Sequence, residues 1–434
     1  MAEPGRGVQD TAFDALIRLA PDGRLGVAVS GGSDSMALLH LARDWASARD
    51  GRELCAVTVD HGLRAESASE ASIVARICAE WGVPHAILKA EGLSGAANLQ
   101  AAARDARYRL MAGWARREGL AAVALGHTMD DQADTVLMRL GRGAGAEGLS
   151  AMAASRDWLG TRWLRPLLGL RRDALRRYLR ENEVGWLEDP SNDDPRFDRV
   201  RARQALEVLE PLGITTEGLA ETAATMMRQR QVLADAMTRL AADAREWGTL
   251  GTVGLSVEAL TDAVPDTALR LFADSLQRVS GARYRARFRS VEPLFRQLIT
   301  GEVAAGTLSG CLLRRAGDTL TILREPGAIA PPLPLAAGDT DWDSRWRVSV
   351  SAPEGLLVGA LGAEGHSVLA EHMDGEALSD WEALPAELRI GAPAIWEDAG
   401  GGVTGALIAV PHAGFVADGT GHLGEIAIEH IHRP

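Results

Sequence analysis

The stretch Ser30-Gly31-Gly32-Ser33-Asp34-Ser35 has the residue types of a phosphate-binding loop. It follows an apolar run at residues 25–29 and precedes a helix-forming run, so a strand, a tight turn and a helix are expected in that order. Glycines let the backbone approach a phosphate closely, and hydroxyls, N–H groups and the positive end of a helix attract its oxygens. We therefore predict that the loop binds a pyrophosphate group; the alternative is a serine-rich turn in which Asp34 caps the helix.

This loop is not a Walker A motif. That motif requires Gly-Lys-Ser/Thr, whereas the single lysine of the chain, Lys89, is far from any glycine-rich loop. The sequence therefore excludes ordinary P-loop chemistry.

A second candidate site is Gly126-His127-Thr128-Met129-Asp130-Asp131-Gln132-Ala133-Asp134-Thr135, which follows an apolar run at residues 121–125. Asp131 and Asp134 are one helical turn apart, so both carboxylates can face a common cation. The helix dipole alone also favours carboxylates at a helix start, but ligands of open α/β sheets bind at the carboxyl ends of the strands. We therefore predict a cation-binding site around this pair.

Two further stretches are weaker candidates. Arg104 and Arg107 are three residues apart in a helix-forming run and so share a face, although a solvated helix face explains them equally well. The stretch Asp60-His61-Gly62-Leu63-Arg64 follows the second apolar run, where it is either a ligand-binding loop or a polar turn.

The elements that must position these residues alternate between short apolar runs and longer amphipathic runs, as in βαβ units around a parallel sheet. Strands are expected at residues 25–29, 54–59, 86–88 and 121–125, and helices at residues 34–45, 68–81 and 98–118. The pattern predicts a doubly wound α/β domain with a parallel sheet.

Three domains are expected along the chain. The catalytic α/β domain would occupy residues 1–212. A helical domain over residues 213–327 is predicted from helix-forming runs at 215–247 and 265–298, and it would end in a β-hairpin with arms at 307–314 and 319–324. Residues 328–434 would form a small β-containing C-terminal domain.

Charge and cysteine content limit the possible partners and compartments. The net charge is -13, and residues 328–434 hold 16 acidic and 4 basic residues, whereas residues 156–203 hold 12 arginines and 9 acids. Cys55, Cys78 and Cys311 form no Cys-x-x-Cys pair, so a zinc site, an iron–sulfur cluster or a disulfide framework is not expected. Residues 1–10 contain no apolar core of a signal peptide, and no run reaches about 18 apolar residues, so neither export nor a membrane partner is expected and a cytoplasmic location is predicted.

The loop at residues 30–35 resembles the PP-loop of the ATP pyrophosphatase superfamily, whose members cleave ATP between its α- and β-phosphates. Over residues 25–203, the order and spacing of the motifs resemble the tRNA(Ile)-lysidine synthetase family. The additional motifs are Arg139-Leu140-Gly141-Arg142-Gly143-Ala144-Gly145-Ala146-Glu147-Gly148-Leu149, Arg165-Pro166-Leu167-Leu168 and Asp189-Pro190-Ser191-Asn192. The chain departs from the family pattern at Asp134, usually glutamate, at Val200, usually asparagine, and at Ala144, commonly a hydroxyl residue.

The resemblance implies that ATP adenylates the wobble cytidine of tRNA(Ile), and that free L-lysine then displaces AMP to give lysidine. It implies a role in chemistry or binding for each candidate residue. ATP would be bound by Ser30, Gly31, Gly32, Ser33, Asp34 and Ser35, with Asp34 assisting Mg²⁺, and lysine by Asp131 and Asp134. Arg104 and Arg107 would stabilise charge during adenylation, and Arg139, Arg142 and Arg165 would contact tRNA phosphates.

Two other functions compete with this interpretation. A tRNA cytidine thiolase shares the PP-loop but, by family resemblance, needs paired cysteines, and the isolated cysteines oppose it. A nucleotide-binding regulatory module without catalysis would need a similar fold but not the pair Asp131 and Asp134.

Overall fold

The computed structural model describes residues 7–60, 67–90, 99–188, 196, 198–336, 338–351, 353–373, 375–400, 402, 404–417 and 426–431. The motif residues 61–64 and 189–192, and the first residue of the helix expected at 98–118, lie outside these ranges. The chain divides into two compact units, Met1–Gln231 and Val232–Pro434. Among the described residues, no helix is both long and apolar enough to cross a membrane.

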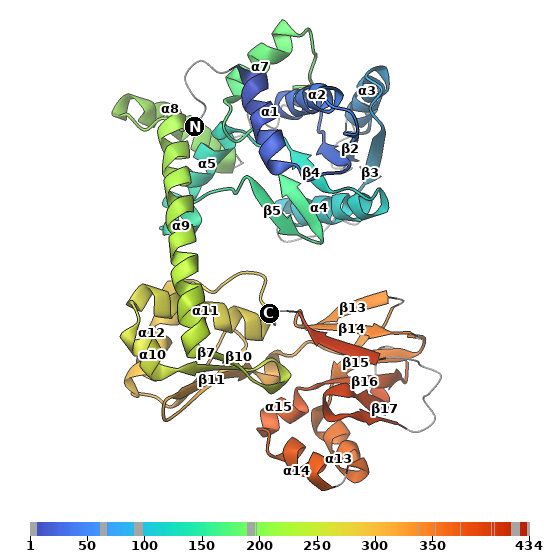
Figure 1. Cartoon of the computed structure of the whole chain (residues 1–434), viewed down its shortest axis with the longest axis vertical. Helices are drawn as coiled ribbons and strands as arrows, with labels where there is room; N and C mark the ends of the chain where they lie inside the picture. The colour runs from blue at the N-terminus through green and yellow to red at the C-terminus, as the bar shows by residue number, and fades with distance from the viewer. Residues whose placement is uncertain are drawn as a thin grey trace. The chain divides into compact units, whose positions relative to one another are not determined.

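The N-terminal unit is built on a six-stranded sheet with the strand order β3-β2-β1-β4-β6-β5 (Figure 1). The strands are β1 (Leu25–Ala28), β2 (Leu54–Asp60), β3 (His85–Lys89), β4 (Ala122–Leu125), β5 (Ser155–Trp158) and β6 (Thr161–Leu164). All neighbours pair in parallel except β5, which forms an antiparallel hairpin with β6. The parallel sheet predicted from the apolar runs is confirmed, and the β5–β6 hairpin is an addition to it.

Helices cover both faces of this sheet, as the alternation of side chains along its strands requires. In β4, Ala122 and Ala124 pack with α1 (Val8–Leu19), α2 (Ser33–Ser47), α3 (Ser67–Glu80) and α7 (Arg172–Glu181). Val123 and Leu125 face the opposite core, formed with α4 (Leu99–Arg117). Because successive residues of a strand point to opposite faces, this short strand contributes to both cores.

The strand order has a topological switch point between β1 and β4, which opens a crevice at the carboxyl ends of these two strands. The chain runs from β1 outward to β2 and β3, and then returns to β4 on the other side of β1. Helices following β1 and β4 therefore lie on opposite sides of the point where the order reverses, and ligands of open α/β sheets bind in that gap. Both candidate stretches, residues 30–35 and 126–135, begin at this point.

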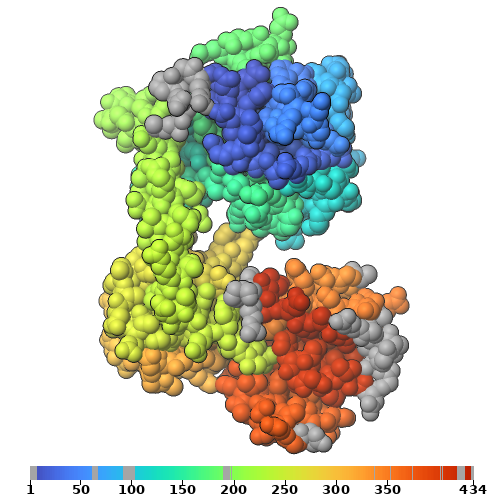
Figure 2. Space-filling view, viewed as in Figure 1, coloured from blue at the N-terminus to red at the C-terminus, as the bar shows by residue number. Residues whose placement is uncertain are grey.

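The remaining helices of the N-terminal unit are α5 (Met129–Leu140), α6 (Ala146–Leu149), α8 (Asp198–Leu209) and the short η2 (Glu210–Leu212). The long helix α9 (Thr216–Ala244) begins in this unit and ends in the C-terminal unit. Residues 228–235 of α9 are exposed apart from the half-buried Leu233, and this yellow-green stretch is open to view in Figure 2.

The first part of the C-terminal unit contains more β-structure than the sequence predicts. The helices are α10 (Val257–Asp262), α11 (Pro265–Ser280) and α12 (Phe288–Thr300). They pack against a five-stranded antiparallel sheet of order β7-β8-β11-β10-β9. Its strands are β7 (Arg245–Trp247), β8 (Val253–Ser256), β9 (Ala305–Leu308), β10 (Cys311–Ala316) and β11 (Thr319–Arg324).

The predicted β-hairpin is confirmed as the antiparallel pair of β10 and β11, but its first arm has different bounds. The expected strand at residues 307–314 is interrupted by Ser309 (φ 54°) and Gly310 (φ 73°), which turn the chain back between β9 and β10. Residues with a positive φ cannot continue a strand, so β9 is a separate strand that extends the β10–β11 hairpin into a three-stranded meander.

In the last part of the unit, the described residues form two small antiparallel sheets and the α-helices that accompany them. One sheet has the order β12 (Leu333–Pro334), β15 (Leu356–Ala360), β16 (Pro393–Asp398), β17 (Thr404–Val410) and β18 (Phe415–Val416), and the other β13 (Gly338–Trp342), β14 (Trp346–Val350) and β19 (Ile426–His430). The helices are α13 (Gly362–His372), α14 (Gly375–Glu382) and α15 (Ala386–Ile390). Leu250 and Leu323 share a core with Leu357 and Leu407, so apolar packing continues across residue 328. The division into three domains stays a prediction.

Candidate active site

A pocket of about 1240 Å³ lies at the carboxyl ends of β1 and β4. Its walls come from the loop at residues 30–35, the end of β2, the segment after β4, the start of α7, and α8. Pockets for one small ligand usually measure about 300–1,000 Å³. The volume is therefore sufficient for more than one reactant, and the lining mixes arginines with carboxylates.

The PP-loop is held in shape by its own serine side chains. Ser35 Oγ accepts a hydrogen bond from the Ser30 backbone N–H at 3.1 Å and donates to the Gly32 carbonyl at 2.9 Å. Gly31 adopts φ +89°, a conformation that favours glycine, and its carbonyl accepts a bond from the Leu187 N–H at 2.9 Å. Intramolecular hydrogen bonds therefore fix the turn, and a preorganised loop loses little conformational entropy when a phosphate binds.

The structure brings together all the predicted ATP-binding residues, although one of them faces away from the main pocket. Ser30, Gly32, Ser33, Asp34 and Ser35 line it. Gly31 instead lies in a neighbouring apolar pocket of about 230 Å³, together with residues of α3 and the segment after α7.

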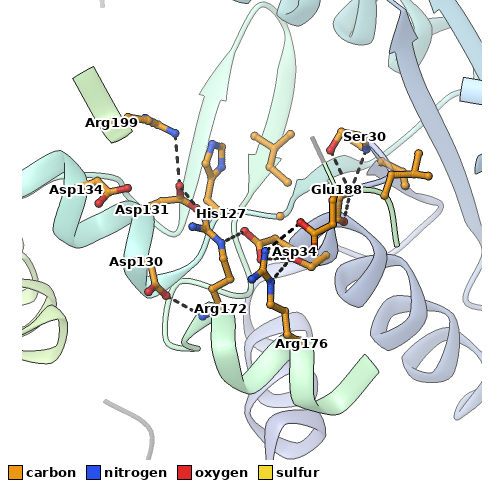
Figure 3. A pocket seen from close by; sticks show the side chains of 18 of the residues that line it. Ser30, Asp34, His127, Asp130, Asp131, Asp134, Arg172, Arg176, Glu188 and Arg199 are labelled. Atoms are coloured by element: carbon orange, nitrogen blue, oxygen red, sulfur yellow. Dashed lines mark hydrogen bonds and ion pairs between the residues drawn. The ribbon is translucent and has the colours of Figure 1, made fainter. Parts of the chain in front are cut away.

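Asp34 is paired with an arginine that the sequence did not associate with it. Arg172 Nε lies 2.8 Å from Asp34 Oδ2, and the two side chains are only 19% and 18% exposed. Burial raises the pKa of Asp34 above its usual value, and Arg172 opposes this effect. Burial alone would lower the pKa of Arg172, but Asp34 and Asp131 together raise it. The two side chains form an ion pair at the centre of the pocket (Figure 3).

Asp131 has two functions in the structure. One carboxylate oxygen accepts bonds from the Thr128 N–H at 2.9 Å and the Thr128 hydroxyl at 3.1 Å, which completes a capping box at the start of α5. Its other oxygen faces Arg172 at 3.6 Å and Arg199 at 3.5 Å. Burial alone would raise the pKa of Asp131, but His127, Arg172 and Arg199 lower it.

Asp134 lies one turn further along α5, lines the same pocket and is 2% exposed. Arg203 of α8 donates to its Oδ2 at 3.0 Å. Burial raises the pKa of Asp134, and Arg203 opposes that shift. The predicted convergence of the two carboxylates on one side of α5 agrees with this geometry, and an arginine of α8 pairs with each of them.

His127 is a pocket residue whose role the sequence did not predict. Burial lowers its pKa to about 3, with Asp131 opposing the shift and nearby arginines adding to it. Its Nδ1 atom is buried and has no partner among the described residues. A neutral imidazole with an unused nitrogen can donate a hydrogen bond to a bound ligand or accept one from it.

The predicted pair Arg104 and Arg107 separates in the structure. Arg107 lines the pocket, whereas Arg104 is exposed and outside it, with one nitrogen 3.5 Å from the Tyr108 hydroxyl. Burial alone would raise the pKa of Tyr108, but Arg104, Arg107 and Arg165 lower it. Arg107 is therefore the member of the pair that can reach a reacting group.

Of the three predicted tRNA contacts, one is freely exposed. Arg142 has a 66% exposed side chain that pairs with Asp198 at 3.0 Å. Arg139 is half-buried and donates to the carbonyls of Gly148 at 2.7 Å and Ala151 at 3.1 Å. Arg165 is 7% exposed and donates to the Ala153 carbonyl at 2.9 Å. A phosphate contact by Arg165 would require this buried side chain to leave its position.

Sequence reasoning also missed how α7 and α8 enter the pocket. Arg172 and Arg176 follow the apolar run at residues 167–170 and lie four residues apart on α7. In the structure Arg176 reaches the PP-loop, with its Nε 3.4 Å from Ser33 Oγ. Arg199 and Arg203 lie four apart on α8 and face the α5 carboxylates, and this spacing was the one local signal for them.

Comparison with known proteins agrees with this site. Residues 8–209 match the family described as the PP-loop domain. The chain is 42% identical over 422 residues to a tRNA(Ile)-lysidine synthase from Ruegeria pomeroyi, with 96% of each chain covered. It is 39% identical over 339 residues to a tRNA(Ile)-lysidine synthase from Hyphomonas neptunium, and this alignment covers 75% of this chain and 89% of that relative. The chain belongs to the tRNA(Ile)-lysidine synthase family.

Proposed function

We propose that the protein joins L-lysine to the wobble cytidine of tRNA(Ile), using ATP and passing through an adenylated cytidine. The products are lysidine, AMP and pyrophosphate. The observation that carries this proposal is that the PP-loop and the carboxylates Asp131 and Asp134 line one pocket at the switch point of the sheet. A site for a polyphosphate and a site for an amine therefore lie side by side.

The PP-loop residues and α7 supply the groups that bind the ATP phosphates. The hydroxyls of Ser30, Ser33 and Ser35 and the N-terminus of α2 attract phosphate oxygens, and Arg176 adds positive charge beside Ser33. Asp34 fits Mg²⁺, because this ion is commonly bound by one or two carboxylates together with substrate phosphates. Mg²⁺ held there would neutralise charge on the departing pyrophosphate.

The first chemical step activates the cytidine. The carbonyl oxygen of the base is a poor leaving group, and its attack on the α-phosphate converts it into an AMP ester, from which AMP leaves readily. Negative charge grows on the phosphate oxygens as the pyrophosphate departs. Arg107, which lines the pocket, is the predicted arginine that can stabilise this charge.

The second step needs a lysine whose ε-amine is oriented and has lost a proton. Asp131 and Asp134 bind the ammonium group through charge-assisted hydrogen bonds. Because burial raises its pKa, Asp134 is a stronger proton acceptor than an exposed carboxylate. It can therefore take the proton before the amine attacks the ring carbon and AMP leaves.

ATP:pyrophosphate exchange, measured with and without tRNA(Ile), tests the proposal. We expect exchange to require tRNA and AMP release to require L-lysine. Exchange without tRNA would show that the base is not the group adenylated, and no exchange under any condition would favour a regulatory module. The thiolase alternative is opposed by the structure, because Cys55 and Cys78 are buried and burial raises the pKa of each thiol to about 11.

A further inference from the structure

Arg172 lies between the two halves of the proposed site. It is the first residue of α7, and its backbone N–H donates to Asp130 Oδ2 at 2.8 Å. Its guanidinium places Nε 2.8 Å from Asp34 Oδ2 and a terminal nitrogen 3.6 Å from Asp131 Oδ1 (Figure 3). One side chain thus contacts the carboxylate on the ATP side and a carboxylate on the lysine side.

The backbone of Arg172 is fixed, so a change of partner has to be made by the side chain. Asp130 anchors the first turn of α7, and the Met129 N–H donates to the Leu170 carbonyl at 2.9 Å just before it. Further along, His40 of α2 and Tyr178 of α7 are hydrogen-bonded at 2.8 Å. These contacts tie α7 to both α2 and α5 and leave the guanidinium as the movable part.

Charge balance makes this position sensitive to ligands. Asp34 and Asp131 have side chains that are 18% and 9% exposed, and a buried carboxylate without a cation is costly. Arg172 provides the cation for Asp34 and shares Asp131 with Arg199. A divalent cation at Asp34 would compete with Arg172 there, and ATP phosphates would offer the guanidinium a new partner, since its planar fork suits phosphate as well as carboxylate.

We propose that Arg172 couples the two substrate sites, so that Mg²⁺·ATP draws its guanidinium away from Asp34 and Asp131 and thereby makes Asp131 available to the lysine ammonium. This inference rests on the proposed function. While Arg172 pairs with Asp131, lysine must compete with it for this carboxylate. Once ATP is bound, that competition is removed, and lysine binds more tightly. By thermodynamic linkage, lysine must then strengthen ATP binding by the same factor.

Arg203 provides a matched comparison, because it contacts a carboxylate on the lysine side only. It pairs with Asp134 at 3.0 Å, and the described contacts link it to neither Asp34 nor the PP-loop. Replacing it changes how strongly lysine binds but not how strongly ATP affects that binding. Replacing Arg172 removes the effect of ATP itself.

Calorimetric titration of the full chain with L-lysine tests this coupling, with and without Mg²⁺ and an ATP analogue that has a methylene group between the α- and β-phosphates. In the wild-type protein we expect the analogue to tighten lysine binding at least about fivefold, the lower end of typical coupling between sites. The coupling is measured as the ratio of the lysine affinity with the analogue to the lysine affinity without it. Arg172→Gln should bind lysine more tightly than wild type without the analogue, and its ratio should fall close to one. Arg203→Ala should keep the wild-type ratio.

Arg172→Lys guards against a folding defect, since it keeps the charge but cannot bridge two carboxylates, and we expect a ratio between those of wild type and Arg172→Gln. The coupling is refuted if Arg172→Gln and Arg172→Lys both retain the wild-type ratio, or if wild type itself shows no dependence on the analogue. Lysine binding with a ratio of one contradicts the coupling alone. Failure of wild type to bind lysine in either condition contradicts the proposed function as well.

Discussion

Gly126 connects β4 to the segment that carries the α5 carboxylates, and it packs directly on the first turn of α2. A Cβ at this position would lie 3.1 Å from the backbone carbonyl carbon and oxygen of Asp34 and 3.1 Å from the Ser35 Cα. These are backbone atoms, so no side-chain rotation can make room. We therefore predict that Gly126→Ala displaces the start of α2, and the PP-loop with it.

The size of the effect follows from this geometry. Ordinary contacts of a Cβ begin at about 3.4 Å, so the two segments must separate by a few tenths of an ångström. Overpacking of this kind costs about 1–3 kcal/mol of stability. A displacement of 1 Å at a reacting centre can cost about 100-fold in rate, so the smaller shift here should lower kcat/KM for ATP by about three- to tenfold.

ATP:pyrophosphate exchange in the presence of tRNA and thermal unfolding of the same samples measure the two effects. Gly169→Ala is the matched control, because a Cβ at Gly169 would meet no atom within 4 Å. If Gly126→Ala matched Gly169→Ala in both ATP kinetics and unfolding temperature, the reasoning from close backbone packing would be refuted.

Three further predictions concern individual side chains. Asp134→Ala should raise the KM for lysine in a steady-state assay. Asp134→Glu should be tolerated, because it keeps the carboxylate facing Arg203. A changed KM for ATP with an unchanged dependence on lysine would contradict this prediction. Arg142→Ala should reduce the slope of the logarithm of the tRNA association constant against the logarithm of the salt concentration by about 0.7–0.9, the value for one phosphate contact. Arg165 is buried, so Arg165→Ala should leave this slope unchanged. Equal slopes for the two variants would argue against Arg142 as a contact. Between pH 6.5 and about 3, His127 is protonated in the unfolded chain but not in the folded chain. The free energy of unfolding should therefore fall with falling pH by up to about 1.4 kcal/mol per pH unit. His127→Asn should flatten this pH dependence in urea unfolding, and an unchanged pH dependence would refute the prediction.

Local signals in the sequence determined the N-terminal fold and the nucleotide loop. The apolar runs that became β1 and β4 are each followed by a polar turn and a helix, and this order can be read without tertiary information because strand burial and helix initiation depend on neighbouring residues. The spacing of Asp131 and Asp134 likewise placed both on one side of a helix. Between residues 232 and 327, the short strands β7 and β8 lack such a signal. The distant strand β11 pairs with β8, and β8 in turn pairs with β7, so tertiary pairing stabilises both.

Tertiary structure alone decided which charges face one another. Arg172 and Asp34 are 138 residues apart, and Arg203 and Asp134 are 69 apart, so neither pair produces a periodic pattern. The tertiary structure also decided that Arg165 is buried, because the residues around it in the sequence do not distinguish it from a surface arginine. Burial and ion pairing depend on which helices the sheet brings together, and a long flexible side chain can satisfy its charge in many places until the fold fixes its neighbours.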